Sequence, residues 1–164
     1  MNINSFFEVI ILKRISYIEN FTQWREGFSF FEEVKVRFSE TDMYGHLNNT
    51  IPFTYYEVAR IEFFKHLGFM QSWLDPNGEK IPVVADLQCD FWKQVYFGET
   101  LRIYVKVHQV GTSSLDLHYL AVNEKDEPVF TGRGAVVQIS KITGKSVPWT
   151  DEEKVEWNRC MYLG

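Results

Sequence analysis

One segment restricts the possible folds more than any other: residues 50–67 have the pattern of a single long helix that is apolar over most of its surface. Tyr55, Ala59 and Phe63 form a row at a spacing of four residues, and a second row starts at Tyr56. Side chains at that spacing share a helix face, and a helix with several apolar faces must be largely buried. At about 1.5 Å per residue it is about 27 Å long, enough to cross a small domain.

The residues at both ends of this segment favour a helix of that length. Asn48 or Asn49 can cap its start, because an asparagine side chain accepts a hydrogen bond from an N–H of the first turn. Pro52 is tolerated in the first turn, where the backbone N–H has no helical partner. Gly68 is suited to the end. The sequence therefore predicts one helix with a defined start and end.

Apolar and polar residues alternate along most of the remaining chain, which is the period of a half-buried strand. The alternation predicts five strands, at residues 33–38, 81–92, 101–107, 115–121 and 129–140. The last four follow one another through short connections, so we expect antiparallel neighbours. Thr150 and Glu153 have capping-box spacing and predict a short C-terminal helix. One buried helix against an antiparallel sheet is an α+β arrangement.

The first part of the chain has a different character. Residues 1–30 are interpreted as an N-terminal extension of a domain that spans residues 31–164. Gly27 can end a short helix in this extension, and Phe21 and Trp24 would share one face of it. We expect the extension to pack against the domain or against a second subunit.

Composition excludes several classes of protein. The net charge is −5 and no run of Lys and Arg exceeds two residues, so the basic stripe of a nucleic-acid-binding protein is missing. Cys89 and Cys160 are too few for a disulfide scaffold. The most apolar N-terminal stretch, residues 6–12, is far shorter than the roughly 20 residues that cross a bilayer. We therefore expect no membrane insertion and a cytoplasmic location.

The chemistry is concentrated in residues 39–49, Ser-Glu-Thr-Asp-Met-Tyr-Gly-His-Leu-Asn-Asn. This loop carries the carboxylate of Asp42 and the imidazole of His46 to the start of the buried helix. A helix N-terminus offers unpaired N–H groups and a partial positive charge, which can stabilise a developing oxyanion. A nearby carboxylate can attack a carbonyl or deprotonate water. Taken alone, however, the same residues are equally suited to turns, caps and packing.

These residues are part of a longer pattern. The pattern comprises Val36 to Asp42, Gly45 to Asn49, Tyr55, Glu57, Ala59-Arg60, Glu62, Phe97-Gly98-Glu99, Val110 to Ser114, Thr143-Gly144-Lys145 and Pro148. In this order and spacing, over about residues 33–150, the chain resembles the 4-hydroxybenzoyl-CoA thioesterase-like hotdog family. One departure is Pro52, where the family usually has an aromatic residue, so the pocket wall must differ.

The resemblance implies a hotdog fold, in which an antiparallel sheet wraps around one long central helix. It also implies a homodimer or homotetramer with active sites between subunits. The residue that matches Asp42 is the nucleophile or general base of the family, and the N–H that matches Asn49 points at the thioester oxygen. His46 would act in catalysis, support the loop or bind substrate, and Asn48 would bind substrate or cap the helix.

Further binding residues follow from the same resemblance. Ser113 and Ser114 would meet the pantetheine or phosphates of coenzyme A, although hydrogen bonding at a strand end explains them equally well. Arg133 suits a phosphate through its guanidinium, with a solvated strand residue as the alternative. Trp92 would line the acyl pocket or pack in the core. Glu57 and Arg60, three residues apart, are expected to form a structural ion pair, with a catalytic role as the less favoured alternative.

Metals and cofactors are not expected. His66, His108 and His118 show no metal-type spacing with acids or cysteines, and a thioester is already an activated acyl group. The resulting hypothesis is an acyl-CoA thioesterase. An acyl-carrier-protein thioesterase and a non-catalytic acyl-binding hotdog module remain as alternatives.

Overall fold

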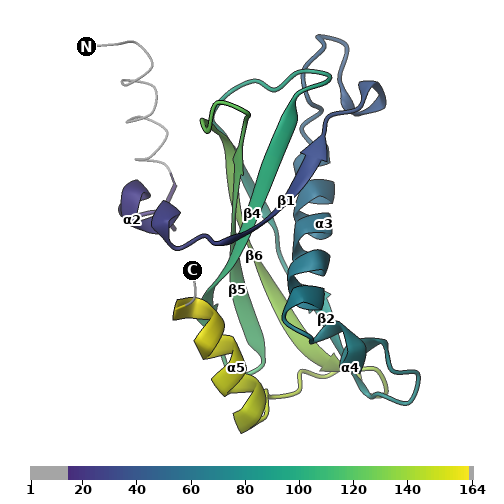
Figure 1. Ribbon diagram of the computed structural model, residues 1–164. Coiled ribbons are helices and arrows are strands. Elements are labelled where there is room, and N and C mark those ends of the chain that lie inside the picture. The colour runs from purple at the N-terminus through teal and green to yellow at the C-terminus, as the bar shows by residue number, and fades with distance from the viewer. Residues whose placement is uncertain (1–14, 163–164) are drawn as a thin grey trace.

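The computed structural model describes residues 15–162, in which a curled sheet of six strands packs against one long helix (Figure 1). The strands follow the order β1-β4-β5-β6-β2, with β3 also paired to β6, and every pairing is antiparallel. The elements are α2 (Phe21–Glu26), β1 (Phe30–Lys35), the short 3₁₀ helix η1 (Phe38–Glu40), α3 (Ile51–His66), α4 (Met70–Leu74), β2 (Lys80–Val84), β3 (Gln88–Phe91), β4 (Thr100–Val110), β5 (Ser114–Val122), β6 (Pro128–Ser140) and α5 (Asp151–Tyr162).

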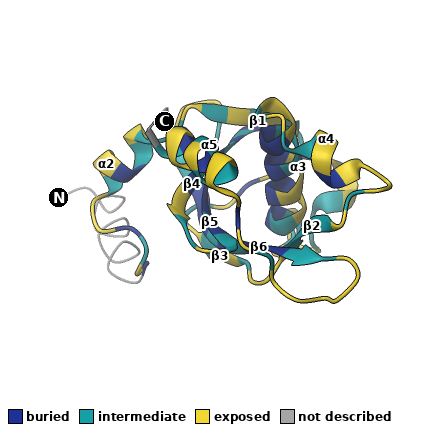
Figure 2. Ribbon diagram, turned by 90° about the horizontal axis from the view of Figure 1, so that it is seen from below, coloured by how far each residue is buried: buried dark blue, intermediate teal, exposed yellow. Residues whose placement is uncertain are grey.

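Helix α3 confirms the prediction of one long buried helix. Seven of its sixteen residues are buried, and Figure 2 shows its dark-blue side turned toward the sheet. The ring of Tyr56 stacks on Tyr119 of β5 with centroids 4.3 Å apart. A side chain at Gly132 of β6 would lie 2.6 Å from the Tyr56 hydroxyl, so the helix approaches this strand too closely for any larger residue.

The predicted ion pair between Glu57 and Arg60 does not form. Arg60 is only 7% exposed and donates a hydrogen bond to the hydroxyl of Tyr119 at 3.2 Å, whereas Glu57 is exposed. The two side chains differ because Arg60 belongs to the face of α3 that the sheet covers. Burial therefore gives Arg60 a phenol as its partner instead of a carboxylate.

Two strand boundaries differ from the prediction. Strand β1 begins at Phe30 and ends at Lys35, because the backbone N–H of Arg37 donates to the carboxylate of Glu40 at 2.8 Å and closes the η1 turn. Residues 81–92 form two strands, β2 and β3, instead of one. The break occurs at Asp86, whose carboxylate accepts the N–H of Ala135 at 2.8 Å in place of a regular strand pairing.

The remaining elements confirm the predictions. Strands β4, β5 and β6 form an antiparallel meander at the predicted positions. Helix α5 starts with the predicted capping box, in which the Thr150 N–H donates to Glu153 at 2.8 Å and the Glu153 N–H donates to Thr150 at 3.1 Å. Within residues 15–162, no helix is long and apolar enough to cross a membrane.

The segment of residues 15–28 packs on the outer face of the sheet, opposite α3. Ile15, Ile18 and Trp24 form a small apolar cluster with Leu120 and Val122 of β5. Within this segment α2 begins after Asn20, whose side chain accepts the N–H of Gln23 at 3.1 Å, and it ends at Gly27 as predicted. The other part of the predicted extension, residues 1–14, lies outside the described residues.

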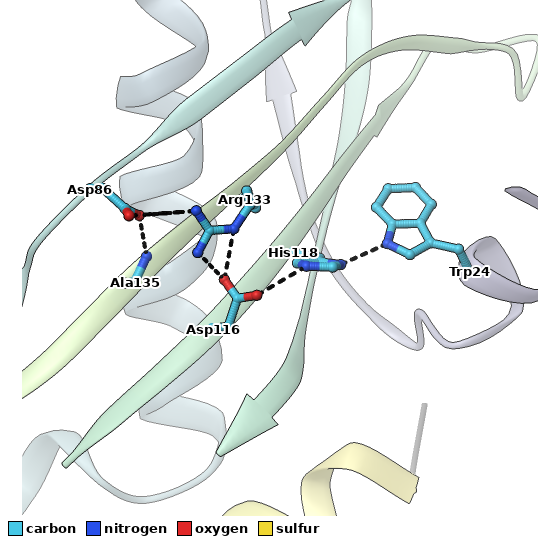
Figure 3. A network of polar contacts seen from close by, with 6 residues as sticks. All are labelled: Trp24, Asp86, Asp116, His118, Arg133 and Ala135. Atoms are coloured by element: carbon cyan, nitrogen blue, oxygen red, sulfur yellow. Dashed lines mark hydrogen bonds and ion pairs between the residues drawn. The ribbon is translucent and has the colours of Figure 1, made fainter. Parts of the chain in front are cut away.

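A polar network anchors this segment to the sheet (Figure 3). The indole N–H of Trp24 donates to Nδ1 of His118 at 2.7 Å, and Nε2 of His118 lies 3.3 Å from Oδ2 of Asp116. The other oxygen of Asp116 accepts from Nε and Nη2 of Arg133, at 3.0 and 2.7 Å. Arg133 also lies 3.5 Å from the carboxylate of Asp86. The network thus crosses the outer face from α2 to the end of β2.

His118 makes the stability of the fold dependent on pH. Burial lowers the pKa of His118 from 6.5 to about 4, against the opposing pull of Asp116. Between pH 6.5 and about 4, His118 is protonated in the unfolded chain but neutral in the folded chain. The free energy of unfolding therefore falls as the pH drops through this range. We predict that this group accounts for about 3 kcal/mol of that fall.

The measurement is chemical denaturation across this pH range for the wild type and for His118→Gln, which cannot take up the proton but can still accept a hydrogen bond from Trp24. The fall should be smaller in the variant by about the predicted amount. His66→Gln, an exposed histidine of α3, serves as the control. Equal pH slopes in the wild type and His118→Gln would contradict the assignment.

Candidate active site

The loop that carries Asp42 folds into a tight hairpin held by its own backbone. Oδ1 of Asp42 accepts the N–H of Tyr44 at 2.8 Å and the N–H of His46 at 3.1 Å, and the Asp42 N–H donates to the His46 carbonyl at 2.8 Å. The turn requires a φ of +78° at Gly45, which glycine adopts without strain. These bonds fix the direction of the carboxylate, and among residues 15–162 no donor contacts its second oxygen, Oδ2.

A second carboxylate ties the same loop to α3. Oε2 of Glu40 accepts the hydroxyl of Tyr55 at 2.7 Å and the backbone N–H of Arg37 at 2.8 Å. The N–H of Asn48 donates to the Glu40 carbonyl at 2.8 Å. Burial, followed by the contact with Glu40, raises the pKa of Tyr55, so its hydroxyl remains a donor. Asp42 is therefore carried by a loop that is attached to the core on both sides.

The start of α3 is preceded by a turn that leaves the N–H of Asn49 without a partner among residues 15–162. Oδ1 of Asn48 accepts the N–H of Thr50 at 3.1 Å and its hydroxyl at 3.0 Å, and the Asn48 carbonyl accepts the N–H of Ile51 at 3.0 Å. The prediction that Asn48 or Asn49 caps the helix was wrong: the N-cap is Thr50, without a side-chain cap bond, because Asn48 binds the N–H of Thr50 itself and closes the turn before the helix. Within the described part of the chain, the N–H of Asn49 has no hydrogen-bond partner.

One pocket brings together four of the eight predicted site residues. It has a volume of about 360 Å³ and includes Asp42, His46, Asn49 and Trp92 in its lining. Four further residues complete it: Leu47, Phe91, Lys93 and Gln94. Sequence reasoning missed these four, although their proximity to His46 and Trp92 in the chain was a usable signal. Asp42, His46 and Asn49 therefore line one shared space.

His46 is held in this pocket by aromatic contacts. Its ring lies 5.2 Å from the ring of Tyr96 in an edge-to-face arrangement, and its backbone forms an isolated antiparallel bridge with Tyr96. These contacts join the loop to the segment between β3 and β4. His46 thus has a supporting role in the structure in addition to lining the pocket.

A larger hollow of about 790 Å³ lies between β1 and α3. Val34, Val58 and Phe97 contribute much of its apolar wall. The carboxylate of Glu40 at its rim is already bonded to Tyr55 and Arg37. The smaller pocket is therefore the candidate active site, since no donor among residues 15–162 contacts the second carboxylate oxygen of Asp42 there.

Asn48 does not line that pocket, and the other three predicted binding residues, Ser113, Ser114 and Arg133, lie away from it. Ser113 and Ser114 are at the far end of β4, about 35 Å of extended strand from the Asp42 loop, and their carbonyls accept bonds from Gln138 and Trp149. Arg133 lies on the outer face of the sheet, where Asp116 and Asp86 already occupy its guanidinium. Within one subunit, the structure does not bring these residues to Asp42, and their binding roles stay predictions.

The structure also gathers residues whose spacing gave no indication of a cluster. The ligand atoms of His108, Asp116 and His118 lie within 4.8 Å of one another, because the irregular pairing of β4 and β5 after Val107 stacks the two imidazole rings 3.9 Å apart. Such a trio can hold a divalent metal only if each imidazole offers a free lone pair.

The hydrogen bond from the indole of Trp24 to Nδ1 of His118 argues against metal binding by these three residues. An indole N–H only donates, so Nδ1 of His118 is the acceptor and, in the neutral ring, Nε2 carries the proton. Neither nitrogen of His118 then has a lone pair for a metal. Asp116 is in addition neutralised by Arg133. We assign these residues to holding the N-terminal segment.

Comparison with known proteins identifies the family of the chain. The model of the thioesterase-like superfamily matches residues 36–155. The chain is 53% identical over 144 residues to the uncharacterised protein YsmA of Bacillus subtilis (strain 168), covering 87% of this chain and 95% of that protein.

Solved thioesterases share the fold. A DHNA-CoA thioesterase from Staphylococcus aureus superposes with a TM-score of 0.73 at 25% identity, over 82% of this chain and 91% of that one. A thioesterase from Thermus thermophilus, solved with coenzyme A and zinc, gives 0.69 at 26% identity, over 83% and 97%. The chain therefore belongs to the thioesterase-like superfamily, and its sheet curled around a central helix is the hotdog fold.

Proposed function

We propose that this protein hydrolyses an acyl-CoA thioester to the free acid and coenzyme A. The observation that carries the proposal is that Asp42 and Asn49 line the same pocket, and that Oδ2 of Asp42 and the N–H of Asn49 have no hydrogen-bond partner among residues 15–162. Acyl transfer needs both groups, a base or nucleophile and a donor for the oxyanion. Membership of the thioesterase-like superfamily supports the same reaction.

The reaction proceeds through a tetrahedral centre on the thioester carbon. Oδ2 of Asp42 either attacks this carbon itself, forming a mixed anhydride that water then cleaves, or removes a proton from the attacking water. The N–H of Asn49 and the positive end of α3 stabilise the oxygen as it gains charge. Collapse of the centre breaks the C–S bond, and the thiolate leaves and takes up a proton. In this proposal the residues of the pocket support both the attack on the thioester carbon and the breaking of the C–S bond, without a cofactor.

The acyl group is assigned to the aromatic wall of the pocket. Phe91 and Trp92 provide this wall, and Phe91 is 48% exposed and open to a ligand. His46 supports the catalytic loop through Tyr96 and can also contact substrate. Coenzyme A is favoured as the thiol because structural relatives act on or bind it. An acyl-carrier-protein substrate would use the same chemistry and is the second candidate.

A second copy of the chain is expected to close the site. Strand β3 pairs with β6 along one edge, and its other edge has no strand partner among residues 15–162. Pairing of two such edges would extend the sheet and bring a partner's residues toward the pocket.

The Asp42→Asn variant tests the chemistry. Asparagine keeps an oxygen that can accept from Tyr44 and His46, so the loop should keep its shape while the charge is lost. We expect turnover of acyl-CoA, followed by thiol release, to fall by at least about a hundredfold. Asp151→Asn, an exposed carboxylate of α5, is the matched control. Retained turnover in Asp42→Asn would remove Asp42 from the mechanism.

A direct comparison of thiols separates the candidate functions. Matched acyl-CoA and acyl-carrier-protein thioesters are offered at equal concentration, and kcat/KM is measured for each. We expect the coenzyme A ester to be the better substrate. A preference for the carrier protein would establish the second candidate, and tight binding of acyl-CoA without turnover would indicate a non-catalytic binding module.

The assembly is tested by light scattering across a range of protein concentrations. We expect a mass of at least twice the 19.4 kDa of one chain. A species with the mass of a single chain and full turnover would show that the site needs no partner.

A further inference from the structure

The N-terminal segment reaches the wall of the candidate active site. Phe21 of α2 packs its ring against Trp92, with centroids 4.9 Å apart and an interplanar angle of 42°. Trp92 is in turn one of the residues that line the pocket of Asp42 and Asn49. A residue of the extension is therefore one side chain away from the space assigned to the substrate.

A chain of hydrogen bonds holds the other side of the same tryptophan. The indole N–H of Trp92 donates to Oγ1 of Thr131 at 3.0 Å. The hydroxyl of Tyr17 lies 3.1 Å from that Oγ1 and 3.0 Å from Oδ2 of Asp90. Since the carboxylate can only accept, the Tyr17 proton points to Asp90 and the Thr131 proton points to Tyr17. Each group then donates one bond, in a single direction from Trp92 to Asp90.

This chain is enclosed and held in place. Thr131 is fully buried, and burial raises the pKa of Tyr17 above its ordinary value, so its hydroxyl keeps its proton. The segment that supplies Tyr17 and Phe21 is itself fastened by the bond from Trp24 to His118 and by the burial of Ile18. Of the two direct supports of Trp92, Phe21 belongs to this docked segment. The other, Thr131, belongs to β6, and Tyr17 of the segment bonds to its hydroxyl.

We infer that the N-terminal segment sets the acyl selectivity of the enzyme, with Phe21 and Tyr17 as positioning residues that act through Trp92. The inference rests on the proposed function, because it takes the pocket to be the acyl site. Asp42 and Asn49 are held by a separate loop and by α3, so a change at Phe21 leaves the reacting groups in place. What changes is the wall against which the acyl group packs.

The first experiment compares Phe21→Ala with Phe28→Ala. Both phenylalanines are partly buried in the same apolar cluster, but Phe28 packs on Trp24 and Tyr104 and supplies no support to Trp92. We expect Phe21→Ala to lower kcat/KM for a bulky acyl-CoA by about tenfold, mainly through KM, and to change that for acetyl-CoA by less than about twofold. Phe28→Ala should leave the ratio of the two substrates unchanged.

A second readout is independent of turnover. The indole N–H signal of Trp92 is identified by its loss in Trp92→Phe, and its hydrogen exchange is followed by NMR. We expect faster exchange in Phe21→Ala and in Thr131→Val, and wild-type exchange in Phe28→Ala. If the wild type cleaves no thioester but the indole exchange changes as expected, the proposed function fails and the positioning of Trp92 stands.

Two results would overturn the inference. One is unchanged indole exchange in Phe21→Ala, and the other is an equal shift of acyl preference in Phe21→Ala and Phe28→Ala, which would reflect docking of the segment as a whole. Should Phe21→Ala not fold, Phe21→Leu keeps most of the volume and Tyr17→Phe removes only a hydroxyl. Both variants should raise the exchange rate in the same direction, and restoring an aromatic ring with Phe21→Tyr should rescue the selectivity.

Discussion

The burial of α3 in the curled sheet is the contact on which the rest of the molecule depends. Its tyrosine and phenylalanine side chains fill the space between helix and sheet, and apolar burial of this kind is the dominant favourable term in folding. The close approach of Tyr56 to Gly132 and its stacking on Tyr119 set the distance between the layers. With the axis of α3 held in this way, its N-terminus has a defined place at one end of the sheet.

The candidate active site uses that place. The carboxylate of Asp42, the proposed base or nucleophile, is oriented by backbone N–H groups of its own loop, and the loop is attached to α3 through Glu40 and Tyr55. The proposed oxyanion donor, the N–H of Asn49, comes from the turn before the helix. A site built in this way needs few side chains, because backbone geometry supplies the donor and sets the direction of the carboxylate.

The outer face of the sheet, opposite α3, holds the N-terminal segment. Its polar residues, which include His118 and Arg133, are engaged with one another and with the N-terminal segment instead of with solvent or substrate. Through Phe21 and Tyr17 that segment also touches the residues behind Trp92. The N-terminal segment on the outer face therefore contacts Trp92, which also lines the pocket of Asp42 and Asn49.

The sequence alone was enough for the helix, the antiparallel meander and the loop with Asp42, His46 and Asn49, since periodicity and capping are local properties and the motif is contiguous. The sequence did not predict features that depend on pairing between distant residues. One such feature is the break in residues 81–92, which occurs because the carboxylate of Asp86 binds a backbone N–H of β6. Arg60, Arg133 and His118 received their partners only from tertiary structure, since strand register and burial determine which polar group lies opposite each of them. Helices and strands are determined largely by neighbouring residues. The contacts of Arg60, Arg133 and His118, in contrast, join residues 17 to 94 positions apart and exist only once the sheet has formed.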